Sequence, residues 1–359
     1  MNSVEVNYPF NLEARREPAP NFAVLTPFEF LADFRLETQR AKERVWGQAM
    51  DMQTGHPGSA FFHIFEEAVK KGLDTRLNID WFSRLSSEPG INIKKDFPLL
   101  GNGYHRFCAN RNDQTYRRLS EVGVKVNFLN SPASLQRVLP FFGRNHIKMY
   151  IVDNIAWIGG VNISDASFKG IDFVVKVTDQ EIVEALIAQF ARVNENKPKK
   201  DYKVDFSDGS SLIIDRGKPG ESLVLDTAAN LVDSARQSVR NISFFTPDGK
   251  FLRTLKKAQN RGVDVEVLMP TVVEGVYKLI NLWNRFFMGV KRQRIPFKKF
   301  DGRLHAKLLI VDGQIVMFGS HNLMQSGVRA GTEEIALLSG NPELVTSLVE
   351  FYETARKGV

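Results

Sequence analysis

Two segments of this chain share one pattern, in which a histidine precedes a lysine by two residues and an aspartate by seven. The pattern H-x-K-x-x-x-x-D occurs as His146-Ile-Lys148-Met-Tyr-Ile-Val-Asp153 and again as His305-Ala-Lys307-Leu-Leu-Ile-Val-Asp312. Each copy is followed by a glycine-containing step and an asparagine, in Gly159-Gly160-Val161-Asn162 and Gly319-Ser320-His321-Asn322. The chain has only six histidines, so two at matched positions predict a duplicated half-site and one active centre built from both halves.

The segments around the motifs repeat as well. Helical spacing of apolar residues over 30–44 and 227–239 precedes strand-like segments at 45–50 and 241–246. A second pair of helices, 61–71 and 250–261, ends at a basic residue followed by glycine and leads into strands at 75–79 and 265–269. A further helix and strand are expected around 116–128 and 276–295. This alternation predicts an α/β fold whose two halves each contain a mixed, mostly parallel sheet flanked by helices.

The repeat also predicts the domain organisation. We expect an N-terminal extension over residues 1–27, a first half over 28–195, a polar lysine-rich linker over 196–204 and a second half over 205–359. A chain of 359 residues is long enough to bury a substantial core in each half. The two halves should be related by a pseudo-twofold axis.

Composition narrows the class of protein. The formal net charge of +7 favours an anionic partner but does not separate nucleic acid, an anionic membrane and a small phosphate ester. Cys108 is the only cysteine, which excludes an intramolecular disulfide and a cysteine-based zinc site and fits a reducing compartment. The sequence has no signal-peptide pattern and no run of 18 apolar residues. We therefore expect a cytoplasmic protein that is at most peripheral to a membrane.

The motif segments have the pattern of hairpins. Strands over 146–152 and 305–311 would each lead into a tight turn, which the Asp312-Gly313 pair favours in the second copy. Residues two apart in a strand share a face, so each motif histidine would point the same way as its lysine. Asp153 and Asp312 have the opposite parity and fall at the turns, so we interpret them as structural residues.

On these motifs the chain resembles the phospholipase D superfamily, whose signature is the H-x-K-x-x-x-x-D pattern followed by a Gly-rich step and an asparagine. The second copy fits the whole pattern, with six residues between Asp312 and Gly319 and a serine at 320. The first copy departs from it, because five residues precede Gly159 and Gly160 replaces the serine. The resemblance covers about residues 28–355 and implies two fused phospholipase D-like βαβ repeats.

The resemblance implies phosphodiester hydrolysis or transfer without a metal or cofactor, through a covalent phosphohistidine. It makes His146 the nucleophile and His305 the general acid and base, with the assignment by half left open. Lys148 and Lys307 would stabilise the charge of the phosphate oxygens, together with Asn162, Asn322 and Ser320. Family members place acidic residues in the strands after the motifs, which implies that Asp172 and Glu334 orient the histidines, with Glu333 as an alternative to Glu334.

The sequence predicts less about the roles of three other histidines. His321 lies inside the second Gly-Ser step, where we expect a structural role in preference to contact with substrate. His56 and His105 fall in segments that could line the cleft, and substrate contact is the less probable role for both.

Three classes of function remain open. Aromatic residues gather near both motifs. The segment 282–299 combines a basic run with apolar residues, namely Leu282, Trp283, Phe286 and Phe287. This combination fits an interface with anionic lipid, and it fits equally well an ordinary helix core with a solvated basic face. The resemblance is closest to the cardiolipin synthase and phosphatidyltransferase branch, and a fused two-motif chain favours lipid. Because the N-terminal membrane helices common in that branch are missing from the sequence, a nuclease acting on DNA or RNA is the alternative. A non-catalytic phosphate-binding protein is the least favoured reading.

Overall fold

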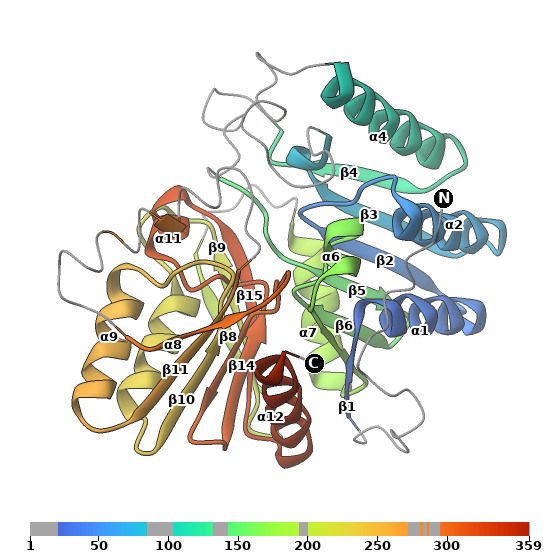
Figure 1. Cartoon of the computed structure of the whole chain (residues 1–359). Helices are drawn as coiled ribbons and strands as arrows, with labels where there is room; N and C mark the ends of the chain where they lie inside the picture. The colour runs from blue at the N-terminus through green and yellow to red at the C-terminus, as the bar shows by residue number, and fades with distance from the viewer. Residues whose placement is uncertain are drawn as a thin grey trace.

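The computed structural model describes residues 21–84, 103–131, 143–193, 200–271, 281–282, 286 and 295–358. Their strands form two sheets, one from each half of the chain, which stand side by side in Figure 1. Sheet 1 has the order β1-β7-β6-β5-β2-β3-β4, and its strands are β1 (Phe22–Leu25), β2 (Arg44–Ala49), β3 (Asp74–Asp80), β4 (Lys125–Leu129), β5 (Met149–Val152), β6 (Ile155–Gly159) and β7 (Val174–Val177). Sheet 2 has the order β12-β11-β10-β13-β14-β15-β9-β8, and its strands are β8 (Tyr202–Asp205), β9 (Ser211–Arg216), β10 (Ser238–Ile242), β11 (Asp264–Pro270), β12 (Phe297–Phe300), β13 (Leu308–Val311), β14 (Ile315–Gly319) and β15 (Glu333–Ser339).

Helices cover the outer face of each sheet and fill the space between the sheets. One apolar cluster packs the outer face of sheet 1 against α1 (Pro27–Arg40), α2 (His56–Lys70), α4 (Gly103–Glu121) and α6 (Asp165–Lys169). A second cluster packs sheet 2 against α8 (Leu223–Ser234), α9 (Gly249–Asn260) and α11 (Gln325–Ala330). A third cluster joins the inner faces of both sheets to α7 (Gln180–Arg192) and α12 (Pro342–Lys357), so the halves share one central core (Figure 1).

The predicted α/β class and the repeat are confirmed by the strand order. Read from β1, sheet 1 matches sheet 2 read from β9, because β2, β3 and β4 take the places of β10, β11 and β12, and each motif hairpin lies in the middle. The expectation of mostly parallel pairing was wrong. Among the described strands, only β2 with β3, β3 with β4, β10 with β11 and β11 with β12 pair in parallel. The hairpin and the return strand after each motif add consecutive antiparallel pairs.

Two helices begin and end several residues earlier than the sequence predicted. The helix expected over 30–44 is α1, which starts at Pro27 because Thr26 and Glu29 form a capping box there. The helix expected over 227–239 is α8, which starts after the Ser222 cap. Both end early because the three backbone N–H groups after each C-cap residue, Ala41 or Ala235, bind a motif aspartate. The strand β10 consequently starts at Ser238 rather than at residue 241.

Strands also begin inside two segments that were expected to lie outside the halves. Residues Phe22–Leu25 of the expected N-terminal extension form β1, which pairs with β7 and buries Phe22 and Val24. The strand β8 starts at Tyr202, within the expected linker. The helix expected near 276–295 lies almost wholly outside the described residues. No helix within the described ranges is both long and apolar enough to cross a membrane.

Candidate active site

The two motif hairpins carry their aspartates at the turns, each with a positive φ, 47° at Asp153 and 54° at Asp312. The Asp153 carboxylate accepts the backbone N–H groups of residues 42, 43 and 44 at 2.8 to 2.9 Å, and the Asp312 carboxylate accepts those of residues 236, 237 and 238. Burial opposes ionisation of both carboxyls, but these donors outweigh it and hold both pKa values below the ordinary range. Each aspartate thus ties its hairpin to the start of a neighbouring strand.

The motif histidines and lysines precede the hairpin strands instead of lying within them, which corrects the expected strand bounds. The strand β5 starts at Met149 and β13 at Leu308. The backbone N–H of His146 donates to the carbonyl of Glu333 at 2.8 Å, and that of His305 donates to the carbonyl of Ile171 at 2.9 Å. Each motif histidine is therefore anchored on the opposite half of the molecule, so one site is built from both halves.

The carboxyl groups are exchanged between the halves in the same way. The Asp172 carboxylate, from the first half, lies 2.7 Å from Nδ1 of His305, and its other oxygen accepts the N–H of Phe173. The Glu334 carboxyl, from the second half, lies 3.7 Å from Nδ1 of His146. The first distance is a short hydrogen bond, whereas the second is too long for one. Asp172 can therefore fix the tautomer of His305, so that Nδ1 donates and Nε2 is left as the acceptor that faces Lys307.

Both motif lysines are fully buried and face the histidines. The Nζ atom of Lys148 donates to the carbonyl of His146 at 2.8 Å, and Nζ of Lys307 lies 2.9 Å from Nε2 of His305. Burial, opposed by Asp172 and Glu334, lowers the pKa of Lys307 to about 8. Burial and the charge of Lys307 lower the pKa of Lys148 well below its ordinary value. The charge of Lys307 acts on Lys148, so the two side chains together form a site that favours an anion.

The histidines are neutral in this setting. Burial and the charge of Lys307 lower the pKa of His305 to about 4, although Asp172 opposes the shift. Burial and the charges of Lys148 and Lys307 lower the pKa of His146 well below the ordinary value. Burial and repulsion from Asp215 raise the pKa of Glu334 to about 8, so this acid is mostly protonated at neutral pH. The two histidines consequently differ in their support, because only His305 has a carboxyl oxygen within hydrogen-bond distance of its ring.

The departure of the first motif at Gly160 has a steric reason. A Cβ atom at residue 160 would lie 2.3 Å from the Asp172 carboxylate, so a serine does not fit there. In the second half, the Ser320 hydroxyl accepts the backbone N–H of Ile335 at 3.0 Å. In the first half, the Asp172 carboxylate itself accepts the equivalent N–H of Phe173. Ser320 in the second half and Asp172 in the first half therefore accept hydrogen bonds from equivalent backbone N–H groups.

The asparagines leave an acceptor available at the site. The Oδ1 atoms of Asn162 and Asn322 are buried and have no hydrogen-bond partner among the described residues. Their backbone N–H groups are held by the Ser167 hydroxyl at 3.2 Å and by the Glu334 carboxyl at 3.4 Å. The backbone of both residues is thus fixed, while their side-chain oxygens have no partner within the described chain.

The other predicted histidines lie in different settings. His321 is 1% exposed, and neither ring nitrogen has a partner within the described chain. Burial and the charge of Lys307 lower the pKa of His321 to about 3. His56 is exposed at the start of α2. The side chain of His105 lies outside the described residues.

Sequence reasoning missed three residues near the site. The ring of Phe244 packs edge-on against His305 at 5.6 Å, and the charge of Asp51 acts on Lys148. Asn145, directly before His146, bonds to both halves. The only signal for Asn145 was that Leu304 stands in the equivalent place before His305.

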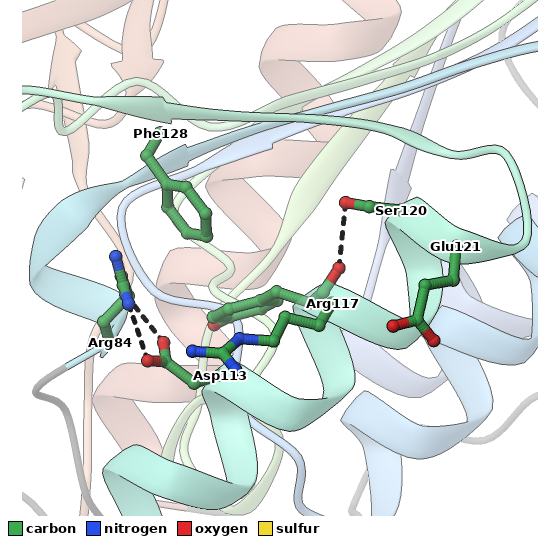
Figure 2. A pocket seen from close by; sticks show the side chains of 7 residues that line it. Arg84, Asp113, Arg117, Ser120, Glu121 and Phe128 are labelled. Atoms are coloured by element: carbon green, nitrogen blue, oxygen red, sulfur yellow. Dashed lines mark hydrogen bonds and ion pairs between the residues drawn. The ribbon is translucent and has the colours of Figure 1, made fainter.

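A pocket of about 390 Å³ lies elsewhere, between α4, β4 and the 3-10 helix Trp81–Arg84 (Figure 2). Arg84 forms two hydrogen bonds of 2.6 Å with Asp113 there, and the guanidinium of Arg84 lies 5.1 Å from the Phe128 ring centre. None of the motif histidines or lysines lines this pocket. Within the described residues, no three His, Cys, Asp or Glu side chains gather as a metal-binding group.

Comparison with known families identifies the family of this chain. The sequence matches the family described as "Cardiolipin synthase, PLD-like domain" over residues 37–194 and 229–355. The chain belongs to this family. The resemblance to the phospholipase D superfamily, cardiolipin synthase branch, is thereby confirmed.

Relatives of this family member are longer than the chain itself. The chain is 26% identical over 290 residues to cardiolipin synthase 1 of Staphylococcus epidermidis, and the match covers 74% of this chain and 53% of that protein. It spans about half the length of the curated relatives that it matches.

Two solved structures share the fold. Phosphatidylserine synthase from Haemophilus influenzae Rd KW20 has a TM-score of 0.68 at 16% identity, covering 95% of this chain and 87% of that one. Polyphosphate kinase from Porphyromonas gingivalis has a TM-score of 0.60 at 11% identity, covering 93% and 50%. Since these two proteins are named for different reactions, the fold alone does not assign the substrate.

Proposed function

We propose that this protein hydrolyses or transfers phosphodiesters through a covalent phosphohistidine, without a metal. The observation that supports this most directly is the crossed arrangement, in which each half supplies a histidine, a lysine and the acid that faces the histidine of the other half. A neutral imidazole is a nucleophile, and two buried cations beside it stabilise the charge that develops on the phosphate oxygens.

In the first step, the His146 ring attacks phosphorus, a nitrogen–phosphorus bond forms and the ester bond to the leaving alcohol breaks. The imidazolium of His305 gives that alcohol its proton. In the second step, His305 removes a proton from water or an acceptor alcohol, whose oxygen displaces His146 from phosphorus. Burial and the lysine charges lower the pKa of His305 in the free site. A bound phosphate anion between the lysines would offset their charges, raise that pKa and let His305 carry the proton.

The unequal carboxyl contacts support this division of roles. The short bond from Asp172 stabilises a positive charge on His305, as a general acid needs. His146 faces the mostly protonated Glu334 at 3.7 Å and gains little stabilisation of its protonated form, as suits a nucleophile that must be unprotonated when it attacks.

Phospholipids are the proposed substrate class. The match to the cardiolipin synthase family supports a phosphatidyl group as the part transferred, and the Phe244 ring places an apolar surface beside His305. We also propose peripheral contact with an anionic membrane through the predicted aromatic and basic segment. Only part of that segment is described, including Leu282 and Phe286, which are 64% and 62% exposed.

The test compares substrate classes under one condition. The protein is incubated in chelator with phosphatidylglycerol vesicles and, separately, with single-stranded DNA and RNA. Cardiolipin or phosphatidic acid as product supports the proposal, whereas nicked nucleic acid with intact lipid supports the nuclease reading. Activity that appears only without chelator contradicts the metal-free mechanism, and phosphate-ester binding without turnover of any substrate supports a non-catalytic protein.

A further inference from the structure

Asn145, directly before the nucleophile, forms hydrogen bonds to both halves through its backbone N–H and its side-chain amide. Its backbone N–H donates to Asp80 at 2.7 Å, and its side-chain nitrogen donates to Glu333 of the other half at 3.1 Å. Its side-chain oxygen accepts from Gln48 at 2.9 Å and from the N–H of Ile147 at 3.2 Å. Asn145 is 1% exposed, so these bonds are formed away from water, where a lost partner is costly.

The Asp80 carboxylate holds this segment from the side of sheet 1. It is fully buried and accepts from Nη1 of Arg144 at 2.9 Å, from the N–H of Phe82 at 2.9 Å and from Asn130 at 3.0 Å, in addition to Asn145. Two consecutive residues before the nucleophile are therefore fixed to the end of β3. Bonds from charged groups in such an interior are stronger than neutral ones.

The contact with Glu333 fixes the same segment to sheet 2. The N–H of Glu333 donates to the carbonyl of Arg144, and the N–H of His146 donates to the carbonyl of Glu333, both at 2.8 Å. Glu334, the acid that faces His146, is the next residue along β15. The hydrogen bond between the Asn145 and Glu333 side chains therefore helps to set the distance between His146 and Glu334.

The second half has no equivalent of the hydrogen bond between the Asn145 and Glu333 side chains among its described residues. Leu304 and Ile171 occupy the places of Asn145 and Glu333, and their backbones form the same parallel bridge between the halves. Leu304 is buried in the central apolar core and offers no side-chain hydrogen bond. His305 instead has the short bond to Asp172, which His146 lacks. The two histidines are thus positioned by different means, one through its ring and the other through the segment before it.

We propose that Asn145 is a positioning residue, which sets His146 against Glu334 by joining Asp80 in one half to Glu333 in the other. The catalytic consequence rests on the proposed phosphodiester function, whereas the placement of the His146 ring does not. Asn145 does not touch the reacting atoms. Its effect reaches the reaction through the orientation of the His146 imidazole.

The primary variant is Asn145→Leu, which installs the residue that the second half uses. Turnover is measured with bis(p-nitrophenyl) phosphate, a soluble diester that requires no lipid or nucleic acid recognition. We expect kcat to fall about 10- to 100-fold, as for other residues that orient a catalytic group, with KM changed by less than about twofold. Wild-type kcat in this variant would contradict the proposal.

A spectroscopic measurement separates positioning from activity. The ring nitrogens of the six histidines are labelled with ¹⁵N, and the His146 signals are assigned from their loss in His146→Ala. Asn145→Leu should move the His146 signals and leave those of His305 in place. Unchanged His146 signals, or displacement of all the histidine signals together, would overturn the positioning role. If the wild type cleaves no diester, the proposed function fails while this measurement still decides the role of Asn145.

Two variants on the other side of the bond serve as controls. Glu333→Gln keeps an oxygen acceptor for Asn145 and should retain most of the wild-type kcat, whereas Glu333→Leu removes the acceptor and should reproduce the defect of Asn145→Leu. This pair also tests the proposal if Asn145→Leu does not fold. Equal effects of Gln and Leu at residue 333 would show that the hydrogen bond is not what matters.

Discussion

The Asp172 carboxylate in one half of the chain lies 2.7 Å from the ring of His305 in the other half, 133 residues away. The reciprocal pair, Glu334 and His146, is separated by 3.7 Å. Each half therefore supplies the acid that faces the histidine of the other half, so the duplicated halves form one site together. The difference between the distances gives the two histidines different electrostatic support.

Asp172→Asn should impair catalysis through the tautomer of His305. An asparagine amide has no negative charge to stabilise the His305 imidazolium and can present a donor to Nδ1 instead. We expect kcat to fall about 100-fold or more with little change in KM. The matched control is Asp179→Asn, the same substitution at the N-cap of α7, which should keep wild-type turnover. Equal kcat in wild type and Asp172→Asn would refute the orienting role.

Replacing each motif histidine separately should distinguish the nucleophile from the acid and base. His146→Ala and His305→Ala should both abolish turnover of natural diesters. With a good leaving group such as p-nitrophenol, His305→Ala should still form the phosphohistidine but should not release it, because no base activates water. Intact mass spectrometry after mixing should detect an adduct in His305→Ala and none in His146→Ala. The opposite pattern would exchange the two roles, and wild-type turnover in either variant would exclude the two-histidine mechanism.

Asp153→Asn should mainly affect stability. The carboxylate accepts three backbone N–H groups at a partly exposed turn, so we expect a loss of about 1–2 kcal/mol in the free energy of unfolding. Because the folded-state pKa of Asp153 lies below its unfolded value, its contribution is complete above about pH 4 and is lost as the pH falls through the folded pKa. Urea unfolding at pH 7 and at pH 3 should show a smaller difference between variant and wild type at the lower pH. A large loss of kcat in the folded variant would instead indicate a catalytic role.

The sequence predicted the features that depend on local pattern. The repeated motif indicated the duplicated half-sites, and alternating helices and strands indicated the α/β class. The turn positions of Asp153 and Asp312 followed from strand parity. Their hydrogen bonds to the backbone N–H groups that follow α1 and α8 did not, because those contacts join residues more than 70 positions apart. The early ends of α1 and α8 were missed for the same reason.

The crossed pairing was beyond sequence reasoning. Asp172 and Glu334 occupy like places after their own motifs, so a local pattern favours neither histidine for either acid. The choice depends on the bridges between Ile171 and Leu304 and between Asn145 and Glu333, which form only when the halves meet. Gly160 likewise looked like an imperfect motif until the position of the Asp172 carboxylate showed that a side chain there would collide with it.

The pH dependence of kcat/KM should have an alkaline limb near pH 8. The pKa of Lys307 is lowered to about 8, so its cation is present below that pH and is lost as the pH rises through it. Loss of this charge weakens binding of an anionic diester in the free enzyme, which kcat/KM reports. Lys307→Arg keeps its charge at every accessible pH, and where this variant retains activity its alkaline limb should move upward. An identical limb in both proteins would assign it to another group.

His321→Val should stabilise the protein and leave turnover intact. The first half has Val161 at the equivalent place, whereas the buried His321 ring has no hydrogen-bond partner among the described residues, which costs about 1–3 kcal/mol. The folded-state pKa of His321 is about 3, below the unfolded value of about 6.5, so the unfolded chain gains a proton that the folded chain does not. Wild-type stability should therefore decline as the pH falls from about 6.5 toward 3, and the variant should decline less. Thermal unfolding across this range measures the difference, and a fall in kcat at unchanged stability would show instead that His321 contacts the substrate.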